Sequence, residues 1–81
     1  MEITVLLFAE LREVAGHGSL TLAVDEECTA GGIAEALAAQ LPDLAGGVRR
    51  AAIAVNQVYV DAEYRVASGD EVAVIPPVSG G

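Results

Sequence analysis

Lysine is absent from this chain of 81 residues, and basic residues of any kind are few. The four cations are all arginines and stand against 12 acidic residues, so the formal net charge is −8. Phosphate groups repel so acidic a chain, and we expect it to bind neither nucleic acid nor an anionic membrane. The charge either simply keeps the protein dissolved or steers it toward a basic partner. Without lysine, the chain has no side-chain amine to which another copy could be conjugated.

Cysteine and histidine occur once each, as Cys28 and His17. One cysteine excludes an internal disulfide framework and a four-cysteine zinc or iron–sulfur site. His17 lies between two glycines with no second histidine or cysteine nearby, so we expect no metal. Cys28 has no histidine close in sequence and is predicted to be a small hydrophobic filler.

Long hydrophobic runs are also missing, since nothing approaches the ~18 apolar residues of a membrane span. The first residues lack the basic stretch of a secretory signal, so we expect a cytoplasmic protein. A chain of 81 residues predicts one domain over residues 1–81. Its core has little room for a deep catalytic pocket, which favours a carrier or binding module over a self-contained enzyme.

The hydrophobic pattern that is present predicts mainly strands. Residues 3–9 are apolar on both faces, with Ile3, Val5 and Leu7 on one and Leu6 and Phe8 on the other, which is typical of a central strand. Residues 20–24 alternate as a half-buried strand does. Further extended segments are expected at 51–55, 58–60 and 71–75. Turns are expected at Asn56-Gln57 and at Ser68-Gly69-Asp70.

The pattern predicts one main helix after Thr29, whose side chain is suited to an N-cap. Its apolar stripe recurs every four residues, at Ile33, Leu37 and Leu41, and Pro42 ends it. Gly31 and Gly32 are poor helix formers in its first turn, and close approach to another backbone is one explanation. Residues 42–47, PDLAGG, are expected to form a loop, and residues 10–15 a short helical turn.

This order of elements is α+β, and it fits a ubiquitin-like β-grasp fold in which a mixed sheet wraps one main helix. In that fold the first and last strands lie side by side in the centre of the sheet. Such an arrangement explains why residues 3–9 and 71–75 are both strongly apolar.

The most specific chemical feature is the tail, Pro76-Pro77-Val78-Ser79-Gly80-Gly81. Two prolines predict a stiff, extended exit from the last strand, and Val78 could anchor on a surface. Gly80 and Gly81 have no side chains, so the end can thread a narrow channel and present an unhindered carboxylate on Gly81. The alternative is a frayed terminus. Gly-Gly after Pro-Pro on this fold pattern favours the reactive carboxylate.

Four segments resemble the small subunits of molybdopterin synthase: VLLFAELREVAG (5–16), AVNQ (54–57), SGDEVAVIPP (68–77) and PPVSGG (76–81). The resemblance implies that an E1-like adenylating enzyme uses ATP and magnesium to activate the carboxylate of Gly81. Sulfur from a persulfide then replaces AMP and leaves a thiocarboxylate. The tail inserts into the large subunit of a heterotetramer, where the sulfur attacks cyclic pyranopterin monophosphate. The chain would bind no cofactor and would act as a co-substrate, with the catalytic side chains on the large subunit.

The resemblance also implies an apolar docking patch at Leu7, Tyr59 and Ile75, although ordinary core packing explains Leu7 equally well. Two other functions of an activated carboxyl terminus stay open. The chain could carry sulfur for thiamine or cysteine synthesis, or it could be a ubiquitin-like protein modifier that forms isopeptide bonds with target lysines. A fourth reading is a plain interaction domain whose tail has no chemistry.

Overall fold

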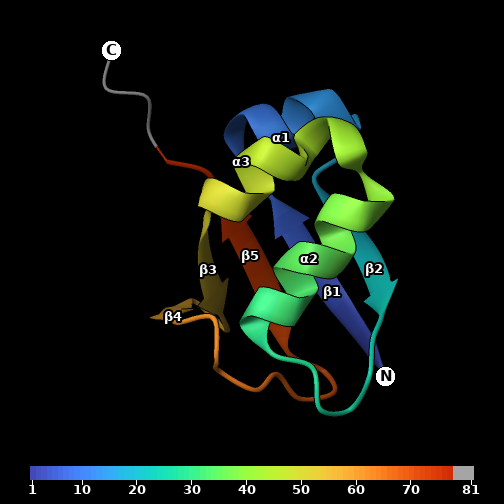
Figure 1. Cartoon of the computed structure of the whole chain (residues 1–81), viewed down its shortest axis with the longest axis vertical. Helices are drawn as coiled ribbons and strands as arrows, with labels where there is room; N and C mark the ends of the chain where they lie inside the picture. Colours follow the sequence, from blue (N-terminus) through green and yellow to red (C-terminus); the bar gives the residue numbers. More distant parts are fainter. Residues whose placement is uncertain (78–81) are drawn as a thin grey trace.

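The computed structural model describes residues 1–77, and Val78, Ser79, Gly80 and Gly81 lie outside the described residues. Within residues 1–77, helices and strands follow one another along the chain (Figure 1). They are β1 (Glu2–Leu7), α1 (Ala9–Ala15), β2 (Ser19–Ala23), α2 (Ala30–Gln40), the 3-10 helix η1 (Pro42–Leu44), α3 (Ala45–Arg50), β3 (Ala52–Val55), β4 (Val58–Val60) and β5 (Glu71–Ile75).

The strands form one mixed sheet in the order β2-β1-β5-β3-β4. The central strands β1 and β5 run parallel, and the other neighbours are antiparallel. The helices lie together on one side of this sheet, and α2 crosses it (Figure 1). The predicted mixed sheet around one main helix, with its first and last strands paired in the centre, is confirmed.

The core lies between the sheet and the helices and is entirely aliphatic. Because side chains alternate along a strand, every second residue of β1 and β5 points toward the helices. Those residues are fully or almost fully buried, as are two residues of the α2 stripe. They are Ile3, Val5, Leu7, Val72 and Val74 from the strands, and Ile33 and Leu37 from the helix.

Helix α2 begins as the sequence predicts. The Oγ1 of Thr29 accepts a hydrogen bond from the N–H of Gly32 at 3.1 Å. Gly31 packs against the chain at Ala62, whose carbonyl oxygen accepts the Gly31 N–H at 2.9 Å. A Cβ atom on Gly31 would lie 3.1 Å from both that oxygen and the Ala62 Cβ. The interpretation that this glycine permits close approach to another backbone is therefore confirmed.

We expect Gly31→Ala to destabilise the protein by about 1 kcal/mol, because overpacking against Ala62 outweighs the gain in helix propensity. Gly46→Ala is the matched control, since its added Cβ would meet only the flexible Arg50 side chain at 3.7 Å. That variant should be up to ~1 kcal/mol more stable than the wild type. Urea denaturation measures both changes, and equal stabilisation by the two substitutions would contradict the packing argument.

The expected loop at residues 42–47 is wrong. The segment forms η1 and the start of α3, although it contains Gly46 and Gly47. Leu44 and Val48 are buried in the core from these turns, so tertiary packing stabilises a helix that the local sequence disfavours. Gly47 leaves room for Leu11, whose Cδ2 would lie 3.1 Å from an added Cβ.

Residues 10–15 are helical as expected, within α1. Gly16 ends that helix with a left-handed backbone, φ 86°, and its N–H donates to the carbonyl of Arg12 at 3.0 Å. This is the conformation for which glycine is favoured at a helix C-terminus. Across residues 1–77, every helix is too short or too polar to cross a membrane.

Candidate functional site

The candidate site begins on the face of the sheet that points away from the helices. Pairing places Leu6 beside Ala73, Ala73 beside Ala54 and Ala54 beside Tyr59. These four residues therefore form an apolar row across four strands. A second row lies nearer the end of β5, where Ala52 pairs with Ile75.

Phe8 extends this second row. Its backbone is still extended, with φ −126° and ψ 160°, so the alternation of β1 continues through it and directs its side chain opposite to that of Leu7. Leu7 pairs with Val74, which brings Phe8 level with Ile75. We define the outer sheet face by these apolar residues: Leu6, Phe8, Ala52, Ala54, Tyr59, Ala73 and Ile75.

The predicted docking patch is wrong at Leu7. This side chain is only 2% exposed, because it points into the core beneath the helices. Tyr59 is 68% exposed and Ile75 is half-buried, and both lie on the outer sheet face, where their docking role stays a prediction. The residue that sequence reasoning missed is Phe8, which is 43% exposed. Its alternation with Leu7 was the available signal.

Two of the segments that carry the family resemblance meet at one end of the sheet. The side-chain amide nitrogen of Asn56, Nδ2, donates to a carboxylate oxygen of Asp70 at 3.0 Å. The side-chain oxygen of Asn56, Oδ1, accepts the backbone N–H of Glu71 at 3.1 Å. The other oxygen of Asp70 accepts the N–H of Ala67 at 2.7 Å. Asn56 and Gln57 both have positive φ, as the tight turn between β3 and β4 requires. These contacts, the Asn56 clasp, fix the start of β5.

The N–H of Ala67 and the side chain of Asn56 stabilise the charged form of Asp70 and lower its pKa. The clasp therefore contributes stability that is complete above the unfolded pKa of about 3.9 and is lost as the pH falls through the lower folded value. We expect the wild type to be more stable than Asp70→Asn at neutral pH, with a difference that shrinks in acid. Denaturant unfolding at several pH values measures this, and a difference independent of pH would refute it.

The other end of β5 leads directly into the tail. Pro76 is buried and Pro77 is exposed, and neither can donate a backbone hydrogen bond. The predicted tail-insertion residues Val78, Ser79 and Gly80, and the reactive Gly81, lie outside the described residues. Ile75 thus belongs both to the outer sheet face and to the strand that carries the tail.

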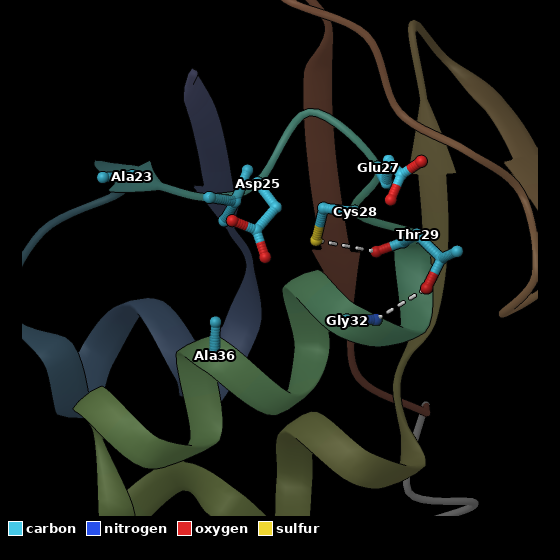
Figure 2. Close-up of a pocket in the computed structure, with 8 residues that line it drawn as sticks. Ala23, Asp25, Glu27, Cys28, Thr29, Gly32 and Ala36 are labelled. Carbon is cyan, nitrogen blue, oxygen red and sulfur yellow. Dashed lines mark hydrogen bonds between the residues drawn. The ribbon is translucent and has the colours of Figure 1, made fainter.

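The remaining candidates do not form a reactive cluster. Cys28 is half-buried beside α2, where its Sγ–H donates to the Thr29 carbonyl at 3.4 Å (Figure 2). Burial, together with the charge of Asp25, raises the pKa of this thiol, which favours the unreactive protonated form. Cys28 packs against the core, so its expected role as a small hydrophobic filler is confirmed. The Nδ1 atom of the exposed His17 lies 3.0 Å from the backbone carbonyl oxygen of Ser19. Residues 1–77 hold no group of three potential metal ligands.

Comparison with known families identifies the chain. The model of the ThiS family matches residues 5–81, which include the outer sheet face, the Asn56 clasp and the tail. This chain belongs to the ThiS family. The match reaches Gly81, so the terminal glycine of the predicted tail lies inside the region that the family shares.

Within the ThiS family, the chain is similar over its full length to molybdopterin synthase sulfur carrier subunits. It is 39% identical to that of Chlamydomonas reinhardtii, covering 100% of both chains. It is 35% identical to that of Dictyostelium discoideum, covering 99% of this chain and 96% of the relative. The resemblance to this group is confirmed.

Solved structures give the same fold. SAMP1 from Haloferax volcanii, 32% identical, superimposes with a TM-score of 0.85 over 100% of both chains. A more distant likeness, 22% identical with a TM-score of 0.65 and covering 100% of both chains, is to a chain of the complex of subunits 1 and 2 of the Helicobacter pylori molybdopterin-converting factor. The predicted α+β, ubiquitin-like β-grasp fold is confirmed.

Proposed function

We propose that this chain is the sulfur carrier subunit of molybdopterin synthase and that it carries sulfur as a thiocarboxylate on Gly81. The observation that supports this most strongly is full-length similarity to sulfur carrier subunits, without gaps in coverage at the tail. The outer sheet face adds a physical reason. This face carries the exposed Phe8 and the half-buried Ile75 at the end of the sheet from which the tail leaves.

The proposed chemistry needs activation because a carboxylate is a poor electrophile with a poor leaving group. An adenylating enzyme joins the Gly81 carboxylate to the AMP moiety of ATP, with magnesium, and releases pyrophosphate. A persulfide sulfur attacks the acyl carbon and displaces AMP. Reductive cleavage of the sulfur–sulfur bond by a donor thiol then leaves the thiocarboxylate. Its sulfur is a nucleophile held on a chain, so sulfur reaches the pterin precursor without release of free sulfide.

The outer sheet face is proposed as the docking surface for both partners, the adenylating enzyme and the large subunit of a heterotetrameric synthase. Exposed aromatic residues such as Phe8 and Tyr59 are typical anchors of protein interfaces. The row between Leu6 and Tyr59 consists of the small apolar residues Ala73 and Ala54. The net charge of −8 would steer the carrier toward basic partner surfaces.

The proposal assigns no bound cofactor to this chain, because ATP and magnesium are substrates of the adenylating partner. It also places the protein in the cytoplasm, where ATP is available for activation. Catalytic side chains for sulfur transfer would lie on the large subunit. Gly81 itself supplies the reacting atoms.

A second candidate function is protein modification, and similarity to the archaeal modifier SAMP1 over the whole chain supports it. The same activated carboxyl group would then react with a lysine amine of a target. Conjugates of increased mass in cell extracts, absent from cells with a Gly81 deletion, would support this function. Transfer of sulfur into thiamine or cysteine remains a further alternative for the same thiocarboxylate.

Intact mass spectrometry tests the proposal directly. The untagged protein is incubated with the adenylating enzyme of the same organism, ATP, magnesium and a persulfide donor. We expect a mass gain equal to the replacement of one oxygen by sulfur, located on Gly81 by fragmentation. Addition of the large subunit and pterin precursor should then reverse the gain. An unchanged mass, with an enzyme that loads its own known carrier, would refute the carrier function.

A further inference from the structure

The junction between β1 and α1 contains two adjacent irregularities. Ala9 has a left-handed backbone, φ 52°, which is sterically unfavourable for a residue with a Cβ atom. The preceding residue, Phe8, leaves 43% of its surface exposed, although burial stabilises a phenyl ring. The positive φ values of Asn56 and Gln57 are explained by their hairpin turn, but Ala9 lies in no such turn. A strained backbone next to an exposed aromatic side chain is typical of functional positions.

The chain is held firmly on both sides of this junction. The N–H of Leu7 donates to the carbonyl oxygen of Gly18 at 2.8 Å, and Leu11 is buried in the core. The carbonyl oxygen of Phe8 accepts the N–H groups of Leu11 at 3.1 Å and of Arg12 at 3.4 Å. The chain must therefore change from strand to helix within residues 8–10. The left-handed backbone of Ala9, in the middle of this segment, makes that change of direction.

We propose that Ala9 is a positioning residue that fixes the direction in which Phe8 projects from the outer sheet face. This inference rests on the proposed docking function. A residue with a Cβ atom has only a small left-handed region, so Ala9 restricts the backbone between Phe8 and the helix. Glycine would populate both signs of φ and release that restriction. A side chain ordered before docking loses less conformational entropy when it binds.

The test compares the full-length wild type with Ala9→Gly. Stability should be unchanged, because relief of the left-handed strain offsets the larger unfolded-state entropy of glycine. The backbone order parameters of residues 8–10, measured by NMR in the free protein, should fall from ~0.85 toward 0.6. Calorimetric titration with the large subunit of the same organism's molybdopterin synthase should show affinity weakened by about 3- to 10-fold.

Two further variants make the test specific. Ala9→Asn keeps a Cβ atom and tolerates the left-handed region, so it should restore the order parameters and the docking affinity. Ala39→Gly, at an exposed position on α2, is the matched control, which should lower stability but leave docking unchanged.

The outcomes separate this inference from the docking function on which it rests. If Phe8→Ala docks weakly while Ala9→Gly keeps both wild-type affinity and wild-type order parameters, the positioning role is overturned and the docking face stands. If Phe8→Ala itself docks like the wild type, the docking face is overturned and the positioning role with it.

Discussion

A chain that lacks Gly81 is expected to fold normally and to accept no sulfur. The described residues that build the core end at Val74, and the buried Pro76 follows them. Glycine has no side chain to bury, so we expect the fold to survive the loss of Gly81. The reaction is lost because the shortened tail would present its carboxylate one residue too early, by about 3.3–3.6 Å along an extended chain. A misplacement of even ~1 Å can cost about 100-fold in rate.

The measurement pairs denaturant unfolding with the mass assay for the thiocarboxylate. We expect unfolding free energies that agree within error, and loading reduced to background for the deletion. A chain extended by two residues past Gly81 should behave in the same way, since its α-carboxylate is then on the wrong residue. Ser79→Ala is a control that retains the tail length. Full loading of the extended chain, with the extra residues still attached, would contradict the carboxylate assignment.

Substitution of two adjacent residues, Leu7 and Phe8, is expected to have opposite effects. Phe8→Ala should leave stability nearly unchanged but weaken docking to the large subunit by about 30-fold or more, as expected for an aromatic anchor worth ~2 kcal/mol or more. Leu7→Ala should destabilise the fold by about 2–5 kcal/mol, because it removes a buried side chain and leaves a cavity. Total stabilities of ~5–15 kcal/mol make that loss large.

Unfolding curves and calorimetric titrations of the two variants measure these effects. Val14→Ala is the matched control, since Val14 is an exposed apolar residue on α1, 61% exposed, outside the outer sheet face. It should change neither property. The assignment of the docking face would be overturned if Val14→Ala and Phe8→Ala weakened docking equally.

Helix prediction succeeded where local signals agree and failed where they conflict. Thr29, the stripe at Ile33 and Leu37, and Pro42 all indicate the same helix, and α2 forms between the expected ends. In the segment 42–47, the proline and two glycines argue against a helix. It forms because Leu44 and Val48 reach a core built largely from other parts of the chain, and burial of those side chains outweighs weak local propensity.

The tail could be predicted from the sequence, whereas the Asn56 clasp could not. The sequence contains AVNQ and SGDEV as separate segments, and nothing local indicates that Asn56 bonds Asp70, 14 residues later. That contact depends on β3 and β5 being neighbours in the sheet. By contrast, the terminal Gly-Gly after two prolines could be read directly, because its proposed chemistry depends on the absence of side chains.

The sequence by itself determined the α+β order of elements, the central place of the first and last strands, and the candidate reactive carboxylate on Gly81. Only the tertiary structure decided which side of β1 faces outward. Both faces of that strand are apolar, so alternation separates Leu7 from Phe8 without indicating which one the helices cover. Helices α1, α2 and α3 pack on one face of the sheet (Figure 1). Leu7 is therefore buried, whereas Phe8 is exposed.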